Sequence, residues 1–336
     1  MPRSGVGDTG RILMLNTSFV QGTEASLPMR FQDRDGDILQ VIADYGGLLA
    51  KRQLKELFWE DKTQRAMEKR LAKLHENGLV SWPDRGMWRS KPVPEPILWL
   101  GWKGMLWLAG RLGLDIPIPA NDGENQMRLF ENRLRAAGFH WLREPRWMQL
   151  EHDLATVDFR LAVQKSLRSL PNIFLETWIH ERELHANMDV IEYETEDSQG
   201  NRRILKRGVC PDSYFVLADQ HRQIDGSPAR ARFLFEMDRS THDNPSFGRE
   251  KVVPGAAYIR STAFKSRFGY NSGRWLVVTT GPVRMKNLIA QTRQSIGADG
   301  RVFLFTTIAE TQSSDVLTSP IWHPTDRDEP MALFST

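Results

Sequence analysis

Hydrophobic residues recur at helical spacing in the first third of the chain and predict three amphipathic helices. Their apolar positions are Ile38, Val41, Ile42 and Tyr45 in the first, Leu54, Leu57 and Phe58 in the second, and Met67, Leu71 and Leu74 in the third. Gly46-Gly47 ends the first helix, and we expect the third to begin with Thr63 as N-cap and to end at Gly78. A polar loop, SWPDRGMWRSKPVPEP, then leads into ILWLGWKGMLWLA, which reads as a strand running into a helix.

This order of three helices and a strand pair joined by a loop is typical of a winged-helix domain, which we place at residues 35–114. Residues 1–34 are rich in Gly, Ser and Arg, show weak periodicity and are expected to form a mobile lead-in. Residues 115–150 are interpreted as a connector that contains a basic helix around Gln126–Gly138.

From Glu151 the pattern changes to alternating helices and strands. EHDLATVDFRLAVQKSL predicts a helix, and VRMKNLIAQTRQSI predicts another between the last two strands. The predicted strands are NIFLETWIHERE, VCPDSYFVLA, ARFLFEMD, RWLVVTT and RVFLFTTI. We therefore expect an α/β domain with a central mixed sheet at residues 151–325, followed by a tail at 326–336.

Composition limits the class of protein. The 336 residues are 40% hydrophobic and 26% charged, which is typical of a globular chain, and the net charge of +3 decides nothing about partners. Cys210 is the single cysteine, so no internal disulfide or structural zinc set is available. No secretory signal core or bilayer-length apolar run is present in the sequence. We expect a cytoplasmic protein with no membrane partner.

The predicted third helix carries a stripe of cations. Between Lys51 and Lys91 there are 11 Lys/Arg against 6 Asp/Glu, and Arg65, Lys69 and Lys73 follow one another every four residues. Such a stripe can contact phosphates in double-stranded DNA, and Gln64 or Arg65 could reach base edges. Candidate DNA-binding residues are Gln64, Arg65, Lys69, Arg70, Lys73 and, beside the wing with Trp82 and Trp88, Arg89. The alternative is a solvated basic helix in a small interaction domain.

Carboxylates lie at the ends of two neighbouring predicted strands. Asp212 opens one strand, while Glu236 and Asp238 end the next and share a face because they lie two residues apart. Carboxylate oxygens converging in this way suit Mg²⁺ or Mn²⁺. We predict Asp212, Glu236 and Asp238 as ligands of one divalent ion.

The acids resemble the PD-(D/E)xK nuclease core, a strand with Asp followed by a strand with Glu-x-Lys. Here Asp238 occupies the lysine position, so either Lys251 substitutes from the following segment or the chemistry is lost or different. His152 is a further catalytic candidate, with a neighbour of the helix cap as the alternative role.

Several other polar residues have two interpretations. Asp158 is expected in a surface salt bridge. Glu181 and Glu183 are placed on a strand, from which one could reach the ion. The run Arg239, Ser240 and Thr241 could hold a phosphate or turn the chain. Tyr258, seven residues after Lys251, could act as a nucleophile on DNA.

Taken together, the early winged helix, HDLATVDFRLA, WIHEREL, PDSYFVL, FEMDRST, Lys251 to Tyr258, WLVVTTG and RVFLFTT resemble the replication-relaxation family over about residues 35–325. The resemblance implies DNA as partner and a plasmid or other mobile element as the setting. The family's short pattern falls on Glu236, Asp238, Arg239 and Ser240, so Asp238 is a family feature.

Three hypotheses remain open from the sequence. The first is a winged-helix protein whose restriction-endonuclease-like domain nicks or relaxes DNA with Mg²⁺ or Mn²⁺. The second is a DNA-binding initiator or transcriptional regulator whose nuclease-like domain is a scaffold without catalysis. The third is a nickase that uses Tyr258. A homodimer is compatible with each of them.

Overall fold

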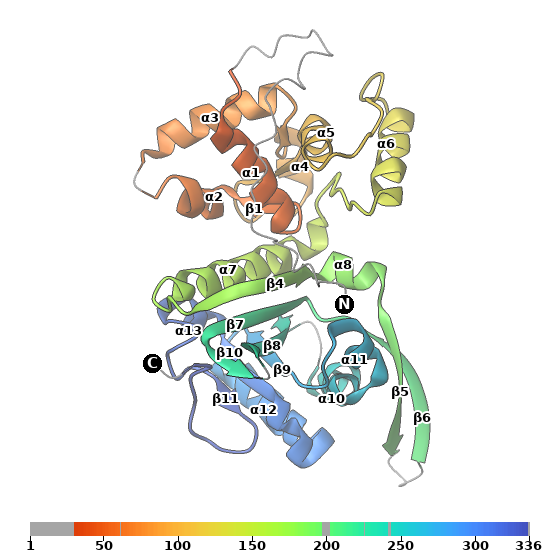
Figure 1. Ribbon diagram of the computed structural model, residues 1–336, viewed down its shortest axis with the longest axis vertical. Helices are drawn as coiled ribbons and strands as arrows, with labels where there is room; N and C mark the ends of the chain where they lie inside the picture. Colours follow the sequence, from red (N-terminus) through yellow and green to blue (C-terminus); the bar gives the residue numbers. More distant parts are fainter. Residues whose placement is uncertain (1–29, 61, 197–201, 225, 241–242, 335–336) are drawn as a thin grey trace, which may run out of the picture.

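The computed structural model describes residues 30–60, 62–196, 202–224, 226–240 and 243–334. Most of the predicted lead-in therefore lies outside the described residues. The described chain forms a helical N-terminal unit and a sheet unit, with the long helix α7 (Leu150–Leu167) running between them (Figure 1).

The N-terminal unit alternates helices with short strands. Its elements are α1 (Asp33–Asp44), β1 (Leu48–Ala50), α2 (Lys51–Phe58), α3 (Gln64–Glu76), β2 (Val80–Ser81), α4 (Arg85–Ser90), β3 (Ile97–Leu100) and α5 (Trp102–Arg111). The strands form an antiparallel sheet in the order β1-β3-β2. The three predicted helices are confirmed. The stretch expected to be a loop contains α4, whose N-cap Asp84 accepts a hydrogen bond from the Met87 backbone.

The ends of α3 follow the predicted capping chemistry. The Thr63 side chain accepts a hydrogen bond from the Ala66 backbone at 3.4 Å. The helix ends at Glu76, and Gly78, two residues on, has a φ of 69°, a left-handed conformation that glycine adopts without strain. The inward side of α3 places Met67, Leu71 and Leu74 in the core of the unit.

The predicted connector packs onto the N-terminal unit. It contains α6 (Glu124–Ala136), which confirms the expected basic helix, and the short η2 (Trp147–Gln149). Phe130 and Leu134 of α6 are buried in the N-terminal core. The connector is therefore a structural part of that unit.

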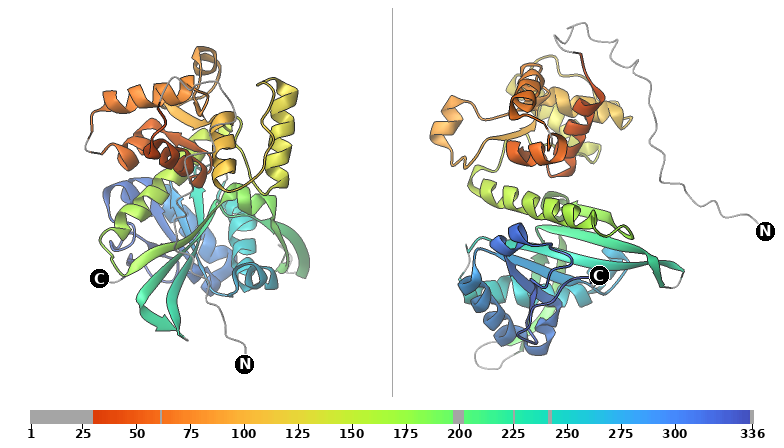
Figure 2. Two further views of the ribbon diagram at one scale, coloured as in Figure 1. Left: turned by 45° about the horizontal axis from the view of Figure 1, so that its top comes forward. Right: turned by 90° about the vertical axis from the view of Figure 1, so that its left-hand side faces the viewer.

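Helix α7 contributes residues to the hydrophobic cores of both units, which explains its position between them in the right-hand view of Figure 2. Val157 and Leu161 belong to the core of the N-terminal unit, whereas Phe159 and Val163 belong to a core of the sheet unit. Arg52 of α2 also forms a two-pronged contact with Asp158, at 2.6 and 2.7 Å, which confirms the salt bridge expected for Asp158.

The sheet unit is built on a mixed sheet, as predicted, with six strands in the order β11-β10-β9-β8-β7-β4; β11 was not among the five predicted strands. Its strands are β4 (Ile173–His180), β7 (Ser213–Ile224), β8 (Ser227–Asp238), β9 (Arg274–Thr279), β10 (Phe303–Thr307) and β11 (His323–Pro324). Strands β8, β9 and β10 run parallel to one another, so their carboxyl ends meet at one edge. Strand β7 pairs antiparallel with both β4 and β8.

Helices cover both faces of this sheet. Helix α7 and the segment around Val316 and Trp322 pack on one face. The other face is covered by a second group of helices. These are α9 (Asn244–Phe247), η3 (Gly248–Val252), α10 (Val253–Arg260), α11 (Thr262–Phe268) and α12 (Pro282–Ile296). Two further helical segments of this unit are η4 (Gly297–Val302) and α13 (Ile308–Ser313).

Two parts of the sheet unit differ from the sequence prediction. The strand expected to reach Glu183 ends at His180, and Glu181 and Glu183 lie on α8 (Glu181–Ala186) instead. Acidic side chains are favourable in the first turn of a helix, which explains the change. A hairpin of β5 (Asp189–Glu196) and β6 (Arg202–Val209) was not predicted, although Ile191, Tyr193 and Thr195 alternate with glutamates in β5; only β6 lacks an apolar alternation.

None of the described helices combines the length and the apolarity that crossing a bilayer would require.

Candidate catalytic centre

The pairing of β7 with β8 brings the predicted acids to one edge of the sheet. Ser213 lies opposite Phe235, and the Asp212 backbone donates a hydrogen bond to the Phe235 carbonyl at 2.9 Å. Asp212 is thus level with the carboxyl end of β8, where Glu236 and Asp238 lie. This is also the edge at which the parallel strands β8 and β9 end, a frequent position for ligand sites in α/β folds.

Asp212 is fixed by two donors. It is 7% exposed, and its Oδ2 atom accepts hydrogen bonds from the Met237 backbone at 2.7 Å and from His152 Nε2 at 3.0 Å. Burial alone would raise the pKa of Asp212, but the neighbouring His152 and Lys251 charges and these hydrogen bonds lower it. Asp212 is therefore held as a carboxylate.

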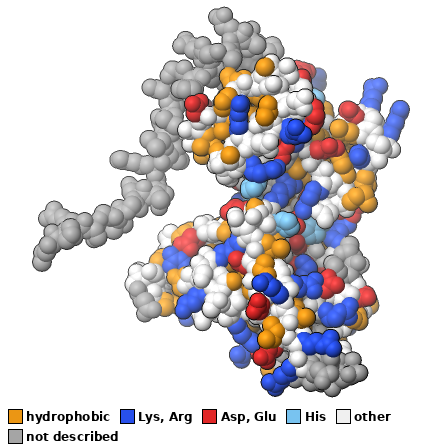
Figure 3. Space-filling view, turned by 90° about the vertical axis from the view of Figure 1, so that its right-hand side faces the viewer, with side chains coloured by type: hydrophobic (Ala, Val, Ile, Leu, Met, Phe, Trp, Pro, Cys, Tyr) orange, Lys and Arg blue, Asp and Glu red, His pale blue; other side chains and the backbone are white. Residues whose placement is uncertain are grey.

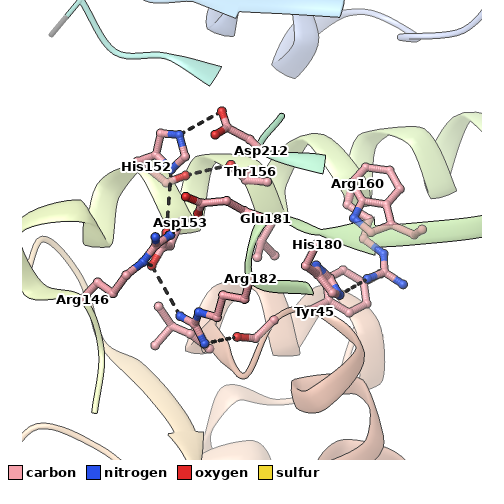
Figure 4. A pocket seen from close by; sticks show the side chains of 14 residues that line it. Tyr45, Arg146, His152, Asp153, Thr156, Arg160, His180, Glu181, Arg182 and Asp212 are labelled. Atoms are coloured by element: carbon pink, nitrogen blue, oxygen red, sulfur yellow. Dashed lines mark hydrogen bonds and ion pairs between the residues drawn. The ribbon is translucent and has the colours of Figure 1, made fainter. Parts of the chain in front are cut away.

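His152 lies near the start of α7, on the side of the helix that reaches Asp212 (Figure 4). Burial would lower its pKa, but the Asp212 charge and hydrogen bonds to Asp153 and Asp212 raise it to about 10. The imidazole is consequently protonated at neutral pH and orients Asp212. The sequence allows His152 two alternative roles, a catalytic residue or a neighbour of the helix cap. In the structure it lies beside the Asp212 carboxylate.

Glu236 has an unusual environment. It is 7% exposed, its Oε1 atom lies 2.6 Å from Lys251 Nζ, and its Oε2 atom is buried with no hydrogen-bond partner among the described residues. Burial and the Asp212 charge raise its pKa to about 7, against the lowering effect of Lys251. A buried carboxylate oxygen without a partner is costly, and such groups concentrate at functional sites.

Lys251 reaches Glu236 from the segment that follows β8. It lies on η3, a π-helical turn between α9 and α10 in one continuous helical run. Pro254 lacks the backbone N–H that would close an α-helical bond to residue 250, so a wider turn is accommodated there. The Lys251 side chain remains 30% exposed, so its ammonium can contact a ligand as well as Glu236.

Asp238 does not join this group, unlike the sequence prediction of three converging acids. Its two oxygens accept hydrogen bonds from Arg284 of α12, each at 2.9 Å, and Oδ2 also accepts one from the Thr279 hydroxyl at 2.6 Å. Within the residues that the structure describes, no group of three or more His, Cys, Asp or Glu side chains is placed to hold a metal ion. The acids near one another are Asp212 and Glu236.

The sequence offered no signal for Arg284 or Thr279 as partners of Asp238. Both come from elements far along the chain, and although Thr279 lies in the WLVVTTG motif, nothing in that motif indicates a contact with Asp238. By contrast, the sequence predicts Lys251 as a substitute for the missing lysine, and this role requires Lys251 to reach Glu236. Its Nζ atom lies 2.6 Å from Glu236 Oε1.

The residues after Asp238 turn the chain. Arg239 forms an ion pair with Glu151 of α7, and the Ser240 hydroxyl lies 2.9 Å from that of Thr280. Ser240 has a φ of 60°, which is rare for a residue other than glycine. Thr241 lies outside the described residues.

Tyr258 has a structural environment. The side chain is 1% exposed, and its hydroxyl donates a hydrogen bond to Asp189. Burial and the Asp189 carboxylate raise its pKa far above the ordinary value for tyrosine. A nucleophilic tyrosine needs access and a lowered pKa, so this environment does not support the nickase hypothesis.

The predicted DNA-binding residues divide into two groups. Arg65, Lys69 and Lys73 are exposed on α3, as the stripe predicts, and Gln64 is exposed with its amide donating to Glu68 at 2.9 Å. Arg89 is exposed on α4. Arg70 instead turns inward, where its Nε donates to the buried Asp35 at 2.6 Å. Arg70 therefore holds α3 against α1 and is not available to DNA.

Comparison with known families yields one match. The model of a family described as replication-relaxation matches residues 39–271, which include α3, Asp212, Glu236 and Lys251. No curated protein matches the sequence.

Proposed function

Because the chain belongs to the replication-relaxation family, we propose that it binds double-stranded DNA through its N-terminal unit and cuts one strand at the Asp212–Glu236–Lys251 centre. The family supports a role in replication or relaxation of DNA. The proposed chemistry rests on the surroundings of Glu236. Its Oε1 atom lies 2.6 Å from Lys251 Nζ, and its Oε2 atom is buried with no hydrogen-bond partner among the described residues.

Two carboxylates are available to a divalent ion. Among the described residues, Glu236 Oε2 has no hydrogen-bond partner, and the Asp212 side chain uses Oδ2 for both of its hydrogen bonds, which leaves Oδ1 to a ligand. Mg²⁺ is commonly held by one or two carboxylates together with water and substrate phosphate, so this pair fits Mg²⁺ or Mn²⁺ without Asp238. When bound, the ion would stabilise negative charge on the phosphodiester.

The chain's own residues would then act around the scissile phosphate. His152 and the Met237 backbone hold Asp212 in one orientation. Lys251 has three donors, of which Glu236 occupies one, so the others can contact a phosphate oxygen or the attacking water. In this role Lys251 replaces the lysine that PD-(D/E)xK nucleases carry two residues after the glutamate.

The fold around the centre supports the same assignment. Helix α7, the antiparallel strands β4, β7 and β8, and the parallel strands β9 and β10 are compatible with a restriction-endonuclease-like domain. The N-terminal order α1-β1-α2-α3-β2-α4-β3 supports a winged helix in which α3 would be the recognition helix and α4 would lie between the wing strands. Arg65, Lys69 and Lys73 would contact phosphates, and we place the protein on a plasmid or other mobile element.

A second function is favoured by one observation. The Lys251–Glu236 pair is largely buried and already neutralises one carboxylate, which a scaffold without catalysis would also require. In that case the protein would be a DNA-binding initiator or regulator. The two functions differ in whether the protein opens a supercoiled plasmid.

The test is incubation of the full chain with supercoiled plasmid and Mg²⁺ or Mn²⁺, with EDTA as the blank. We expect nicked or relaxed circles from the wild type, and a loss of about 100-fold or more in Glu236→Gln and Lys251→Met. Lys265→Met, which removes an exposed lysine of α11, is the matched control and should cut normally. Plasmid that is bound by the wild type but never cut would favour the initiator or regulator.

A further inference from the structure

A small cavity lies where the N-terminal unit meets the sheet unit. It has a volume of about 50 Å³ and is bounded by the turn after α1, the beginning of α7 and the junction of β4 with α8. Its charged lining includes Arg146, Arg160, Arg182, His180, Asp153 and Asp212 (Figure 4). On the face seen in Figure 3, Lys, Arg and His side chains gather at the waist between the two units.

The arginines of this cavity are unequally matched with carboxylates. Arg146 lies 2.5 Å from both Asp153 and Glu181. Arg182 has Asp153 only at 3.8 Å, and its closer contact is the Gly46 carbonyl at 2.7 Å. The carboxylates that line the cavity therefore mainly contact other cations: Asp153 and Glu181 contact Arg146, and Asp212 contacts His152.

Arg160 has the least complete set of partners. It donates to the Asp44 carbonyl, and the same Nη1 atom lies 3.3 Å from His180 Nε2. Its guanidinium lies over the Tyr45 ring at 4.1 Å, and no carboxylate pairs with it among the described residues. Its Nε atom is buried without a hydrogen-bond partner in the part of the chain described. Capping the carbonyls at the end of α1 explains one donor of Arg160 and one of Arg182. The Nη2 atom of Arg160 has no hydrogen bond among the described residues and could donate to a ligand.

The effect of these cations is visible on His180. Burial first, and then the positive charge of Arg160, lower the pKa of His180 to about 4, and Arg182 acts in the same direction. Arg160 therefore adds a positive charge to the lining that no carboxylate of the described residues pairs with. An anion in the cavity would offset that charge.

We propose that this cavity binds a single phosphate group between Arg160 and Arg182. Guanidinium groups are the preferred side-chain partners of phosphate because they offer paired donors. The small volume of about 50 Å³ suits a compact anion such as phosphate. His152 and Asp212 of the cutting centre line the same cavity, so the phosphate would be one of the DNA backbone near the scissile bond. This last identification rests on the proposed function, whereas the anion site does not.

The experiment is a titration of the metal-free full chain with inorganic phosphate at constant ionic strength, followed by calorimetry and by the NMR signals of the His180 ring. We expect one saturable site in the wild type and a rise in the His180 pKa on binding. Arg160→Gln and Arg182→Gln should each weaken phosphate binding at least tenfold. Arg168→Gln is the matched control, because this arginine at the end of α7 has a side chain 64% exposed and should leave binding unchanged.

Folding of each variant is checked by thermal melting, and Arg160→Lys and Arg182→Lys keep the charge if the glutamine variants melt early. No saturable site in the wild type, or wild-type affinity for phosphate in both glutamine variants, would overturn the proposal. A short oligonucleotide should compete with phosphate for the site. Binding of phosphate without such competition would overturn the assignment to DNA and leave free phosphate as the ligand. Since neither metal nor cutting is needed, failure of the plasmid assay does not affect this result.

Discussion

Two charged clusters lie at the same edge of the sheet, and they differ in how completely their charges are matched. Asp238 has both oxygens occupied by Arg284 and Thr279. Glu236 lies two residues earlier on the same strand and face. One of its oxygens contacts Lys251, and the other is buried with no hydrogen-bond partner among the described residues. The strand gives both acids nearly the same burial, at 5% and 7% exposure.

The comparison separates a structural acid from a candidate functional one. A fully bonded buried pair stabilises an arrangement of elements, here β8, β9 and α12. An incompletely bonded carboxylate costs free energy in the folded state unless something binds it. We therefore assign Asp238 to the fold and Glu236 to ligand binding, and each of the following predictions tests that division.

The largest effect on stability is expected from breaking the structural pair. Arg284→Met would leave the Asp238 carboxylate buried without its cation, and should lower the free energy of unfolding by about 3–5 kcal/mol. Urea denaturation measures the change. The double variant Asp238→Asn with Arg284→Met should recover part of the loss, and Arg301→Met, at an exposed site, should cost little. A single variant as stable as wild type would mean that the Asp238 pair is not structural.

The next effect concerns the cations around His180. Its pKa of about 4 in the folded protein is below the ordinary value of about 6.5, so the unfolded chain binds the proton more readily. Stability should be full above pH 6.5 and fall as the pH drops towards 4, by at most about 3 kcal/mol. His180→Gln should flatten this dependence in urea melts at several pH values. The exposed His221→Gln is the control. Equal slopes in the two variants would show that His180 is not the group responsible.

A smaller and purely electrostatic effect is expected at α3. Replacing Arg65, Lys69 and Lys73 by Ala should weaken DNA binding and flatten the slope of log affinity against log salt by about 0.9 for each lost phosphate contact. The matched control removes three exposed cations of the sheet unit, Lys265, Lys286 and Arg301. If the control variant loses more affinity than the α3 variant, DNA is bound by the sheet unit instead.

The smallest change in stability is expected at Glu236. Glu236→Gln keeps the shape of the side chain and removes a carboxylate that burial and Asp212 disfavour. The free energy of unfolding should therefore change by no more than about 1 kcal/mol, in either direction. A loss as large as that of Arg284→Met would place Glu236 among the structural acids and would favour the scaffold hypothesis.

Much of the fold could be predicted from local patterns. The apolar spacing of Ile38 to Leu74, the Thr63 cap and Gly78 specify the helices of the N-terminal unit, and the hydrophobic strands after Glu151 specify the mixed sheet. The β5–β6 hairpin escaped prediction because its register is set by packing of Ile191 and Tyr193 against the helices on one face of the sheet. The alternation of Ile191, Tyr193 and Thr195 with glutamates is a strand signal in β5, but β6 carries no matching one.

The site was less predictable because its decisive contacts are long-range. The spacing of Glu236 and Asp238 places both on one face, but their different roles depend on Arg284, which lies 46 residues beyond Asp238. The inward turn of Arg70 similarly depends on Asp35, a partner 35 residues away. Spacing predicts which residues share a face, whereas the choice between pairing and exposure is made by the packed structure.

We propose that Asp212 and Glu236 hold one divalent ion, because Glu236 Oε2 is buried with no hydrogen-bond partner among the described residues. The most direct measurement is titration of the full chain with Mn²⁺, counting bound ions by electron paramagnetic resonance. We predict one Mn²⁺ site in the wild type, its retention in Asp238→Asn, and its loss in Glu236→Gln. No Mn²⁺ bound to the wild type, or a site that survives in Glu236→Gln and disappears in Asp238→Asn, would contradict the account.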